Sequence, residues 1–256
     1  MPALLFRLTL ALLVAAAAPA ALADSKAPFE PTVGQDGKDV VWVPTPQIVV
    51  DKMLDMAKVT QKDFVMDLGS GDGRTVITAA KRGARAVGIE YNPDMVALSQ
   101  KNAEKAGVTS KANFRQADLF ATDLSQATVV TMFLLPDINL RLRPKILDLK
   151  PGTRVVSNTF TMGEWQPDER ADLHDTCGAS YCTALLWIVP AKAAGTYKIP
   201  QGELTLTQDF QMLTGTLKSE GKTLPVEGKM HGSDIAFTAG GKAYHGRLKG
   251  RQIELR

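Results

Sequence analysis

Two acidic residues flank a glycine-rich segment, and this combination is the strongest chemical signal in the sequence. The segment reads DFVMDLGSGDGRTVITAAKRGARAVGIE and ends at Glu90. Asp67 comes two residues before the first of three alternating glycines, Gly69, Gly71 and Gly73. Glycine lets a ligand approach the backbone closely and permits dihedral angles that a Cβ atom disfavours. The helix expected directly after the loop adds unpaired N–H groups that can face the ligand.

The spacing of these glycines separates two kinds of nucleotide site. A dinucleotide-binding turn requires G-x-G-x-x-G, whereas this loop reads G-x-G-x-G and has Arg74 at the sixth position. The Asp67 carboxylate would repel a pyrophosphate and attract an ammonium group. Glu90 ends the next predicted strand and can accept hydrogen bonds from ribose hydroxyls. These residues predict an adenosyl amino acid as the ligand and disfavour a nicotinamide-dependent oxidoreductase.

At these positions the sequence resembles class I S-adenosylmethionine-dependent methyltransferases. Asp67-x-Gly69-x-Gly71-x-Gly73 is similar to their glycine-rich motif, and Glu90 to their acidic residue after the second strand. Asp118-Leu119 matches the position whose carboxylate takes the adenine amino group in that superfamily. The resemblance implies S-adenosyl-L-methionine as the cofactor, with predicted binding residues Thr45, Asp67, Leu68, Gly69, Ser70, Gly71, Gly73, Glu90, Tyr91, Asp118 and Leu119.

A closer resemblance covers about residues 40 to 165. Val43-Pro44-Thr45-Pro46, the DLGSGDGR loop and Phe133-Leu134-Leu135-Pro136 resemble a prokaryotic group related to the ATP synthase c-subunit lysine methyltransferases. That group is in turn similar to the histone lysine methyltransferases without a SET domain. The resemblance implies an amine acceptor, either a protein lysine or a small amine, and a Val43 to Thr45 stretch that closes over the cofactor. An equally good interpretation makes Thr45 simply a helix cap.

No catalytic residue is evident in the sequence. Methyl transfer depends mostly on positioning and desolvation, and a lysine acceptor, with an ordinary pKa of ~10.4, must lose its proton. The segment from Met132 to Pro136 lacks the Asn/Asp-Pro-Pro-aromatic motif of enzymes that methylate exocyclic base amines or glutamine, which disfavours those acceptors. The nearest candidates for the acceptor side are Asn139, Asn158, Glu164 and Trp165, each of which is explained at least as well as a cap, turn or packing residue.

The elements that would position these residues alternate between strands and helices. Short β-branched runs predict strands, and apolar residues at helical spacing predict helices. Thr45 is expected to cap the first helix with Pro46 at its first position, and Asn92 to cap a later one. This order predicts an α/β domain with a doubly wound, mostly parallel sheet. The predicted helices are 46–58, 74–82, 92–106 and 137–148, and the predicted strands are 64–68, 85–90, 112–117, 128–134, 154–160 and 184–189.

The pattern changes near residue 196. Apolar residues then alternate with polar ones, and Gly-containing turns separate the runs, which predicts an antiparallel meander of about six strands. About 60 residues bury only a thin core, so the meander is expected to dock on the first domain or on a second copy. In a non-catalytic alternative, the meander binds a partner and the α/β domain binds an adenosyl ligand.

Residues 1 to 23 have the features of a secretory signal peptide. Arg7 precedes an apolar run, and Ala21-Leu22-Ala23 provides a cleavage site ahead of Asp24. The run from Leu8 to Ala18 is too short to span a bilayer, so no stable membrane insertion is expected after cleavage. The predicted organisation is a signal peptide (1–23), a flexible leader (24–39), a methyltransferase domain (40–195) and an antiparallel β domain (196–256). In a bacterium the exported product would be periplasmic.

Cys177 and Cys182 are the two cysteines of the chain. A disulfide is the simplest expectation for a cysteine pair in an exported protein. With His174 nearby a metal site is conceivable, but structural zinc normally takes four protein ligands, so no metal is expected.

The charge balance adds a negative prediction. Thirty basic and 27 acidic residues give a net charge of +3, which does not favour a nucleic-acid partner. S-adenosyl-L-methionine is expected in the cytosol, so an exported enzyme would be separated from its cofactor. Three explanations of this conflict stay open. The leader is not a signal peptide or leaves some protein inside, cofactor reaches the exported enzyme, or the loop binds another adenosyl compound without catalysis. The sequence does not predict the oligomeric state.

Overall fold

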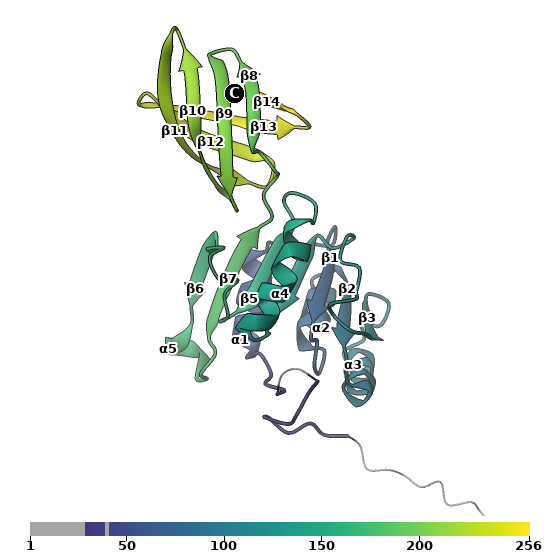
Figure 1. Ribbon diagram of the computed structural model, residues 1–256. Helices are drawn as coiled ribbons and strands as arrows, with labels where there is room; N and C mark the ends of the chain where they lie inside the picture. The colour runs from purple at the N-terminus through teal and green to yellow at the C-terminus, as the bar shows by residue number, and fades with distance from the viewer. Residues whose placement is uncertain (1–28, 39–40) are drawn as a thin grey trace, which may run out of the picture. The chain divides into compact units, whose positions relative to one another are not determined.

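The computed structural model describes residues 29–38 and 41–256. The predicted signal peptide and the first part of the predicted leader therefore lie outside the described residues. Residues 31–256 form one compact unit, which contains two β-sheets (Figure 1). In the part of the chain that the structure describes, no helix has the length and apolar character needed to cross a membrane.

The first sheet has seven strands in the order β3-β2-β1-β4-β5-β7-β6. Strands β1 to β5 are parallel, whereas β7 runs antiparallel between β5 and β6. The carboxyl ends of β1 to β5 therefore meet the amino end of β7 at one edge of the sheet. The bounds are β1 Phe64–Leu68, β2 Arg85–Glu90, β3 Ala112–Gln116, β4 Val129–Met132, β5 Arg154–Asn158, β6 Glu169–Asp172 and β7 Thr183–Ile188.

Helices cover both faces of this sheet, and the predicted α/β class is confirmed (Figure 1). One core joins Val49, Val76 and Val96 of the first three helices to one face, and another joins Ile138 and Leu142 of α4 to the opposite face. Alternate residues of the central strands enter the two cores, which is why these strands present apolar residues on both faces. The helices are α1 Gln47–Met56, α2 Arg74–Lys81, α3 Pro93–Lys105, α4 Pro136–Leu147 and the short α5 His174–Cys177.

The two predicted helix caps have different outcomes. Asn92 caps α3 as expected, because its side chain accepts hydrogen bonds from the backbone N–H groups of Asp94 and Met95. For α1 the prediction is wrong: Pro46 is the N-cap residue, and no side chain caps the helix. Pro46 has an extended ψ of 141°, so the helix begins one residue later than expected and Thr45 lies one residue before the N-cap position. Its carbonyl instead accepts a hydrogen bond of 2.9 Å from Arg74.

Strand β6 and helix α5 are not predicted from the sequence. The residues of β6 are largely exposed, and α5 has only four residues without a buried side chain. Neither element therefore shows the apolar periodicity on which a prediction depends. Strand β6 precedes α5 in the chain, and Cys177, the first cysteine of the pair, is the last residue of α5.

The second sheet is antiparallel and has seven strands, one more than predicted. Its core includes Leu204, Leu217 and Phe237. Strand β8 has a weak sequence signal, since only Tyr197 and Ile199 of its side chains are buried and the alternating run is short. The strands follow the chain in order: β8 Gly195–Ile199, β9 Gly202–Asp209, β10 Met212–Ser219, β11 Lys222–His231, β12 Asp234–Ala239, β13 Lys242–Lys249 and β14 Gln252–Leu255.

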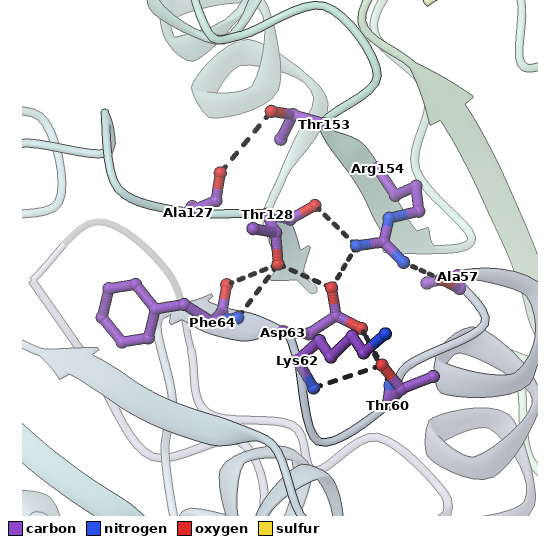
Figure 2. A network of polar contacts seen from close by, with 9 residues as sticks. All are labelled: Ala57, Thr60, Lys62, Asp63, Phe64, Ala127, Thr128, Thr153 and Arg154. Atoms are coloured by element: carbon purple, nitrogen blue, oxygen red, sulfur yellow. Dashed lines mark hydrogen bonds and ion pairs between the residues drawn. The ribbon is translucent and has the colours of Figure 1, made fainter.

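A polar network ties together the amino ends of β1, β4 and β5 (Figure 2). Arg154 bonds the Asp63 carboxylate and donates to the Ala57 carbonyl at 2.8 Å. The Thr128 hydroxyl donates to Asp63 at 2.8 Å, and the Thr60 backbone N–H does so at the same distance. Burial opposes ionisation of Asp63, but the Arg154 guanidinium and these hydrogen bonds outweigh it and lower the pKa. The network lies at the sheet edge opposite the carboxyl ends of the parallel strands.

Candidate active site

A cavity of about 470 Å³ lies at the carboxyl ends of the parallel strands. A smaller cavity of about 40 Å³ adjoins it beside the glycine-rich loop. Residues common to both linings mark the junction, and they are Trp42, Val43, Gly69 and Phe133. A single elongated ligand can therefore occupy both cavities.

The glycine-rich loop between β1 and α2 forms one wall. Gly69, Gly71 and Gly73 all have positive φ angles, of 73°, 53° and 84°. A Cβ atom on Gly73 would also lie 2.7 Å from the Phe114 ring and 2.8 Å from Ser99. Glycine is thus required here both for conformation and for the close contact of the loop with α3 and β3.

Asp67, near the end of β1, is buried in the wall of the smaller cavity and is only 5% exposed. Burial raises the pKa of Asp67 to about 7, and the negative charges of Glu90 and Asp72 raise it further. The Thr131 hydroxyl, which donates a hydrogen bond to Asp67 at 2.5 Å, lowers the pKa and so opposes the effect of burial. A cationic group bound in the smaller cavity would favour the carboxylate form. This site therefore suits the ammonium group of an amino-acid ligand.

Ser70 provides a second polar group in the smaller cavity. Its hydroxyl is buried and has no hydrogen-bond partner among the described residues. That hydroxyl lies against Gly88 of β2, where an added Cβ atom would be 2.5 Å from it, so a ligand in the cavity would meet the backbone of Ser70 rather than its hydroxyl. Asp67 and the loop backbone at Ser70 together fit the amino-acid part of S-adenosyl-L-methionine.

Glu90 ends β2 and lies in the wall of the larger cavity. Its carboxylate accepts hydrogen bonds from three backbone N–H groups, those of Gly71 and Tyr91 at 2.9 Å and that of Asn92 at 3.0 Å. These bonds fix the carboxylate and leave one of its four acceptor positions for a ligand hydroxyl. The geometry is compatible with a ribose contact.

Asp118 follows β3 and lies at the same end of the larger cavity. Lys38 bonds its carboxylate at 2.6 Å, and this bond together with the Phe120 N–H lowers the pKa of Asp118. Lys38 also lies 4.5 Å from the centre of the Tyr91 ring. The segment 35–38 thus lines the cavity, although its polar sequence predicted only a flexible leader and has no periodicity that could have indicated this role.

The structure places nine of the eleven predicted cofactor residues in the two cavity walls. Leu68 and Gly73 line neither cavity, since Leu68 is buried in the core and Gly73 is the N-cap residue of α2. Those in the walls are Thr45, Asp67, Gly69, Ser70, Gly71, Glu90, Tyr91, Asp118 and Leu119.

The four residues suggested for the acceptor side line neither cavity. Trp165 is fully buried and packs on Trp187, and Glu164 is exposed and pairs with Arg143 at 2.7 Å. Asn139 and Asn158 are also fully buried, and Asn139 donates to the carbonyls that follow β5. These positions agree with the alternative interpretation of the four residues as cap, turn or packing residues, because the chain after β5 folds against α4.

Three of the aromatic residues that line the larger cavity lie instead over β4, β5 and β7, namely Phe133, Phe160 and Tyr181. They follow β4, follow β5 and precede β7, respectively. Sequence reasoning included Phe133 only as part of a motif and did not consider the other two. The sequence offered no clear signal for them, because Phe133 and Phe160 lie within the predicted strands 128–134 and 154–160 and Tyr181 precedes the predicted strand 184–189.

The cysteine pair forms a disulfide between Cys177 and Cys182. His174 lies 2.5 Å from the Asp172 carboxylate, which raises the pKa of the imidazole. No cluster of metal-binding side chains occurs among the described residues. The expected disulfide is present, and the His174 imidazole is paired with Asp172.

Residues 67–169 match the family model of the ANTKMT methyltransferase domain. The chain is 47% identical over 153 residues to a protein-lysine N-methyltransferase of Saccharolobus islandicus, covering 59% of this chain and 94% of that protein. It is 38% identical over 128 residues to the mouse ATP synthase c-subunit lysine N-methyltransferase, covering 50% of this chain and 51% of the mouse protein. The chain thus spans about half the length of that relative.

A solved structure is similar over the same part of the chain. It is the crystal structure of an RNA methyltransferase from Salinibacter ruber in complex with S-adenosyl-L-homocysteine. The two chains are 51% identical with a TM-score of 0.55, over 59% of this chain and 95% of that one. S-adenosyl-L-homocysteine is the product that remains when S-adenosyl-L-methionine gives up its methyl group, so the comparison agrees with the geometry of the two cavities.

Proposed function

This chain belongs to the protein-lysine N-methyltransferase family, and on that basis we propose that it methylates the ε-amino group of lysine in a protein substrate. It is a methyltransferase whose cofactor is S-adenosyl-L-methionine. The observation that carries the proposal is the junction of the two cavities. The buried Asp67 carboxylate in the smaller cavity matches the amino-acid part of this cofactor, and Glu90 in the larger cavity matches its ribose. The wall shared by the two cavities lies between these residues.

The predicted cofactor residues fall into three groups along the cavities. Asp67 and Ser70 would hold the amino-acid part, and Glu90 a ribose hydroxyl. Asp118 would hold the adenine amino group. Its carboxylate would then accept hydrogen bonds from both that amino group and Lys38. When bound, S-adenosyl-L-methionine supplies an electrophilic methyl group on a sulfonium centre.

The chain's own residues provide positioning and exclusion of water. Gly69 and Phe133 lie at the junction, and Trp42 and Val43 cover it from the segment before α1. A lysine amine has to lose its proton before it can accept a methyl group, and burial among apolar side chains favours the neutral amine. Catalysis by orientation and desolvation requires few acid-base groups, consistent with the apolar character of this wall.

Lysine is favoured over an RNA acceptor by two features of this chain. The segment after β4 lacks the polar motif that holds a base amine, and in its place Phe133 lies in the cavity wall. The small net charge of +3 offers little attraction for a polyanion. RNA nevertheless belongs among the substrates tested, since one similar structure is that of an RNA methyltransferase.

We further propose that the protein is exported. The composition of residues 1–23 supports this, and the Cys177–Cys182 disulfide is consistent with an oxidising compartment. An exported methyltransferase requires cofactor outside the cytosol or a fraction of protein that is retained inside.

The first test is calorimetric titration of residues 24–256 with S-adenosyl-L-methionine and S-adenosyl-L-homocysteine. We expect micromolar binding that Asp67→Ala and Glu90→Ala each weaken at least tenfold. Lys192→Ala is the matched control, because that side chain is 80% exposed and pairs only on the surface with Asp148. A folded protein without measurable binding would contradict the proposal.

The second test identifies the acceptor. Cell extract and purified RNA are each incubated with the protein and radiolabelled S-adenosyl-L-methionine, and labelled protein is digested for mass spectrometry. We expect methyl groups on lysine side chains, with no label after Asp67→Ala. Label on RNA alone would replace the lysine proposal.

A further inference from the structure

The larger cavity has two chemically different halves, and the strand order separates them. Glu90 ends β2 and Asp118 follows β3, on one side of β1. Phe133 follows β4, Phe160 follows β5 and Tyr181 precedes β7, all on the other side of β1. The half over β2 and β3 therefore has the carboxylates, and the half over β4, β5 and β7 has three aromatic rings.

The three rings form one cluster. The ring centroids are 5.9 Å apart for Phe133 and Phe160, 5.4 Å for Phe133 and Tyr181, and 5.6 Å for Phe160 and Tyr181. The first pair is nearly parallel at 17°, and Tyr181 is inclined to both by 59° and 50°. All three residues line the cavity, and Phe133 also lines the smaller one. The cluster thus begins where the reactive part of the cofactor is expected.

The backbone that carries Phe160 is held by buried polar groups. The preceding residue, Thr159, has a φ of 61°, a conformation that non-glycine residues seldom adopt. The Ser157 hydroxyl donates to the Phe160 carbonyl at 2.8 Å, and the Asn139 amide donates to the same carbonyl at 3.3 Å. The structure thus fixes an unfavourable turn, and the turn places Phe160 in the cavity wall.

Tyr181 is held differently. It is 37% exposed and lies inside the loop that the Cys177–Cys182 disulfide closes, directly before Cys182. Cys182 is fully buried at the start of β7, and its carbonyl accepts a hydrogen bond of 2.9 Å from the Leu173 N–H. The disulfide therefore connects the short helix α5 to the strand that positions Tyr181.

We propose that Phe133, Phe160 and Tyr181 form the acceptor site, which receives the alkyl-ammonium end of a lysine side chain, and that the Cys177–Cys182 disulfide loop is the device that positions Tyr181 in it. Aromatic faces attract ammonium groups, and their apolar surface suits both the lysine stem and added methyl groups. This inference rests on the proposed lysine specificity and adds the residues that recognise the acceptor.

The test measures binding of the acceptor separately from catalysis. The probe is a short blocked peptide with a central Nε-trimethyl-lysine, titrated by nuclear magnetic resonance into the protein loaded with S-adenosyl-L-homocysteine. A peptide with norleucine in place of lysine has a similar apolar stem without the charge. We expect the cationic peptide to bind at least fivefold more tightly than the norleucine peptide.

Ring substitutions then locate the site. Tyr181→Leu and Phe160→Leu should each weaken binding of the cationic peptide at least fivefold, whereas Tyr181→Phe should retain it because the ring remains. Tyr244→Leu is the matched control, since Tyr244 stacks on Phe237 in the second sheet. Cofactor affinity should stay within twofold of wild type in all four variants. Equal binding of the two peptides by the wild type, or unchanged binding after Tyr181→Leu, would overturn the assignment.

The disulfide is tested by the double variant Cys177→Ser/Cys182→Ser. With the lysine form of the peptide as substrate, we expect KM for the peptide to rise at least fivefold, with kcat and cofactor affinity little changed. Tyr181→Leu, in which the disulfide is intact, should likewise raise KM for the peptide and leave kcat little changed. This result does not depend on whether the double variant folds. A wild type that binds cofactor and methylates lysine, but has a KM insensitive to Tyr181→Leu, would refute this inference alone. Absence of cofactor binding would instead refute the proposed function.

Discussion

Asp67 combines a functional role with a cost in stability. Its carboxyl is buried, and its pKa of about 7 lies well above the ordinary value of 3.8. The folded state therefore holds a proton that the unfolded chain has lost between these two pH values. Stability from this group is fully present below pH 3.8 and declines as the pH rises to about 7, by at most about 4 kcal/mol.

Asp67→Asn is accordingly expected to raise the stability of the ligand-free protein. The amide is neutral at all pH values, so the gain in Tm should be several degrees at pH 8 and should vanish near pH 4. Differential scanning calorimetry at both pH values measures the effect. A variant that is less stable than wild type at pH 8 would show that Asp67 is ionised and satisfied within the protein itself.

Cofactor binding should have the opposite dependence on pH. The ligand's ammonium group requires the Asp67 carboxylate, which is increasingly protonated below pH 7 in the free protein. Affinity for S-adenosyl-L-homocysteine should therefore fall roughly tenfold from pH 7 to pH 5.5. Calorimetric titration at a series of pH values tests this, and an affinity that is constant over that range would contradict the assigned role of Asp67.

At the scale of the elements, the network around Asp63 joins three parallel strands at their amino ends (Figure 2). Arg154→Met should destabilise the protein by about 2 kcal/mol at pH 7, because it leaves a buried carboxylate without its cationic partner. The lowered pKa of Asp63 means that the network's stabilisation is present above pH 3.8 and is lost as the pH falls through the folded value. Urea unfolding should therefore show a smaller difference between wild type and variant at pH 3 than at pH 7.

The same substitution should leave cofactor affinity unchanged, since the network lies at the sheet edge opposite the cavities. Lys192→Met is the control for loss of an ion pair, because its partner Asp148 is on the surface and the pair is highly exposed. That control should have a wild-type Tm. A comparable loss of stability in both variants would mean that burial of Asp63 contributes little.

The second sheet contacts the segment around β6 through a few defined groups. Phe210 stacks on Trp165 with centroids 6.1 Å apart, and Gln211 donates to the Gln166 carbonyl at 2.8 Å. Lys229 pairs with Asp168 at 2.8 Å. Among the described residues, none from β8 to β14 lines either of the two cavities.

For the whole molecule, export is the property with the clearest prediction. Expression from the complete sequence in a secreting bacterium should yield a product that begins at Asp24 and has no free thiol. N-terminal sequencing and thiol titration of the periplasmic fraction measure both properties. A product that is confined to the cytosol and still has residues 1–23 would rule out cleavage.

The features that the sequence predicted are those formed by residues close together in the chain. The alternation of strands and helices is a local pattern that predicted the fold class, and the glycine loop with Glu90 and Asp118 carried the resemblance that implied the cofactor. The acceptor-side residues were not predicted, because Phe160 and Tyr181 come together only when β7 inserts beside β5. The role of Lys38 was missed for the same reason, since its partner Asp118 is 80 residues away in the chain.

The position of β7 also has a consequence for the order of folding. Helix α1 packs against β5 and β7, so the first helix of the described chain depends on a strand that ends at Ile188. A chain that emerges from its amino end first must release more than half its length before α1 can be buried. Such non-local pairing delays compaction. Late burial of α1 would suit the proposed export, because a chain that crosses a membrane through a narrow channel must not yet be compact.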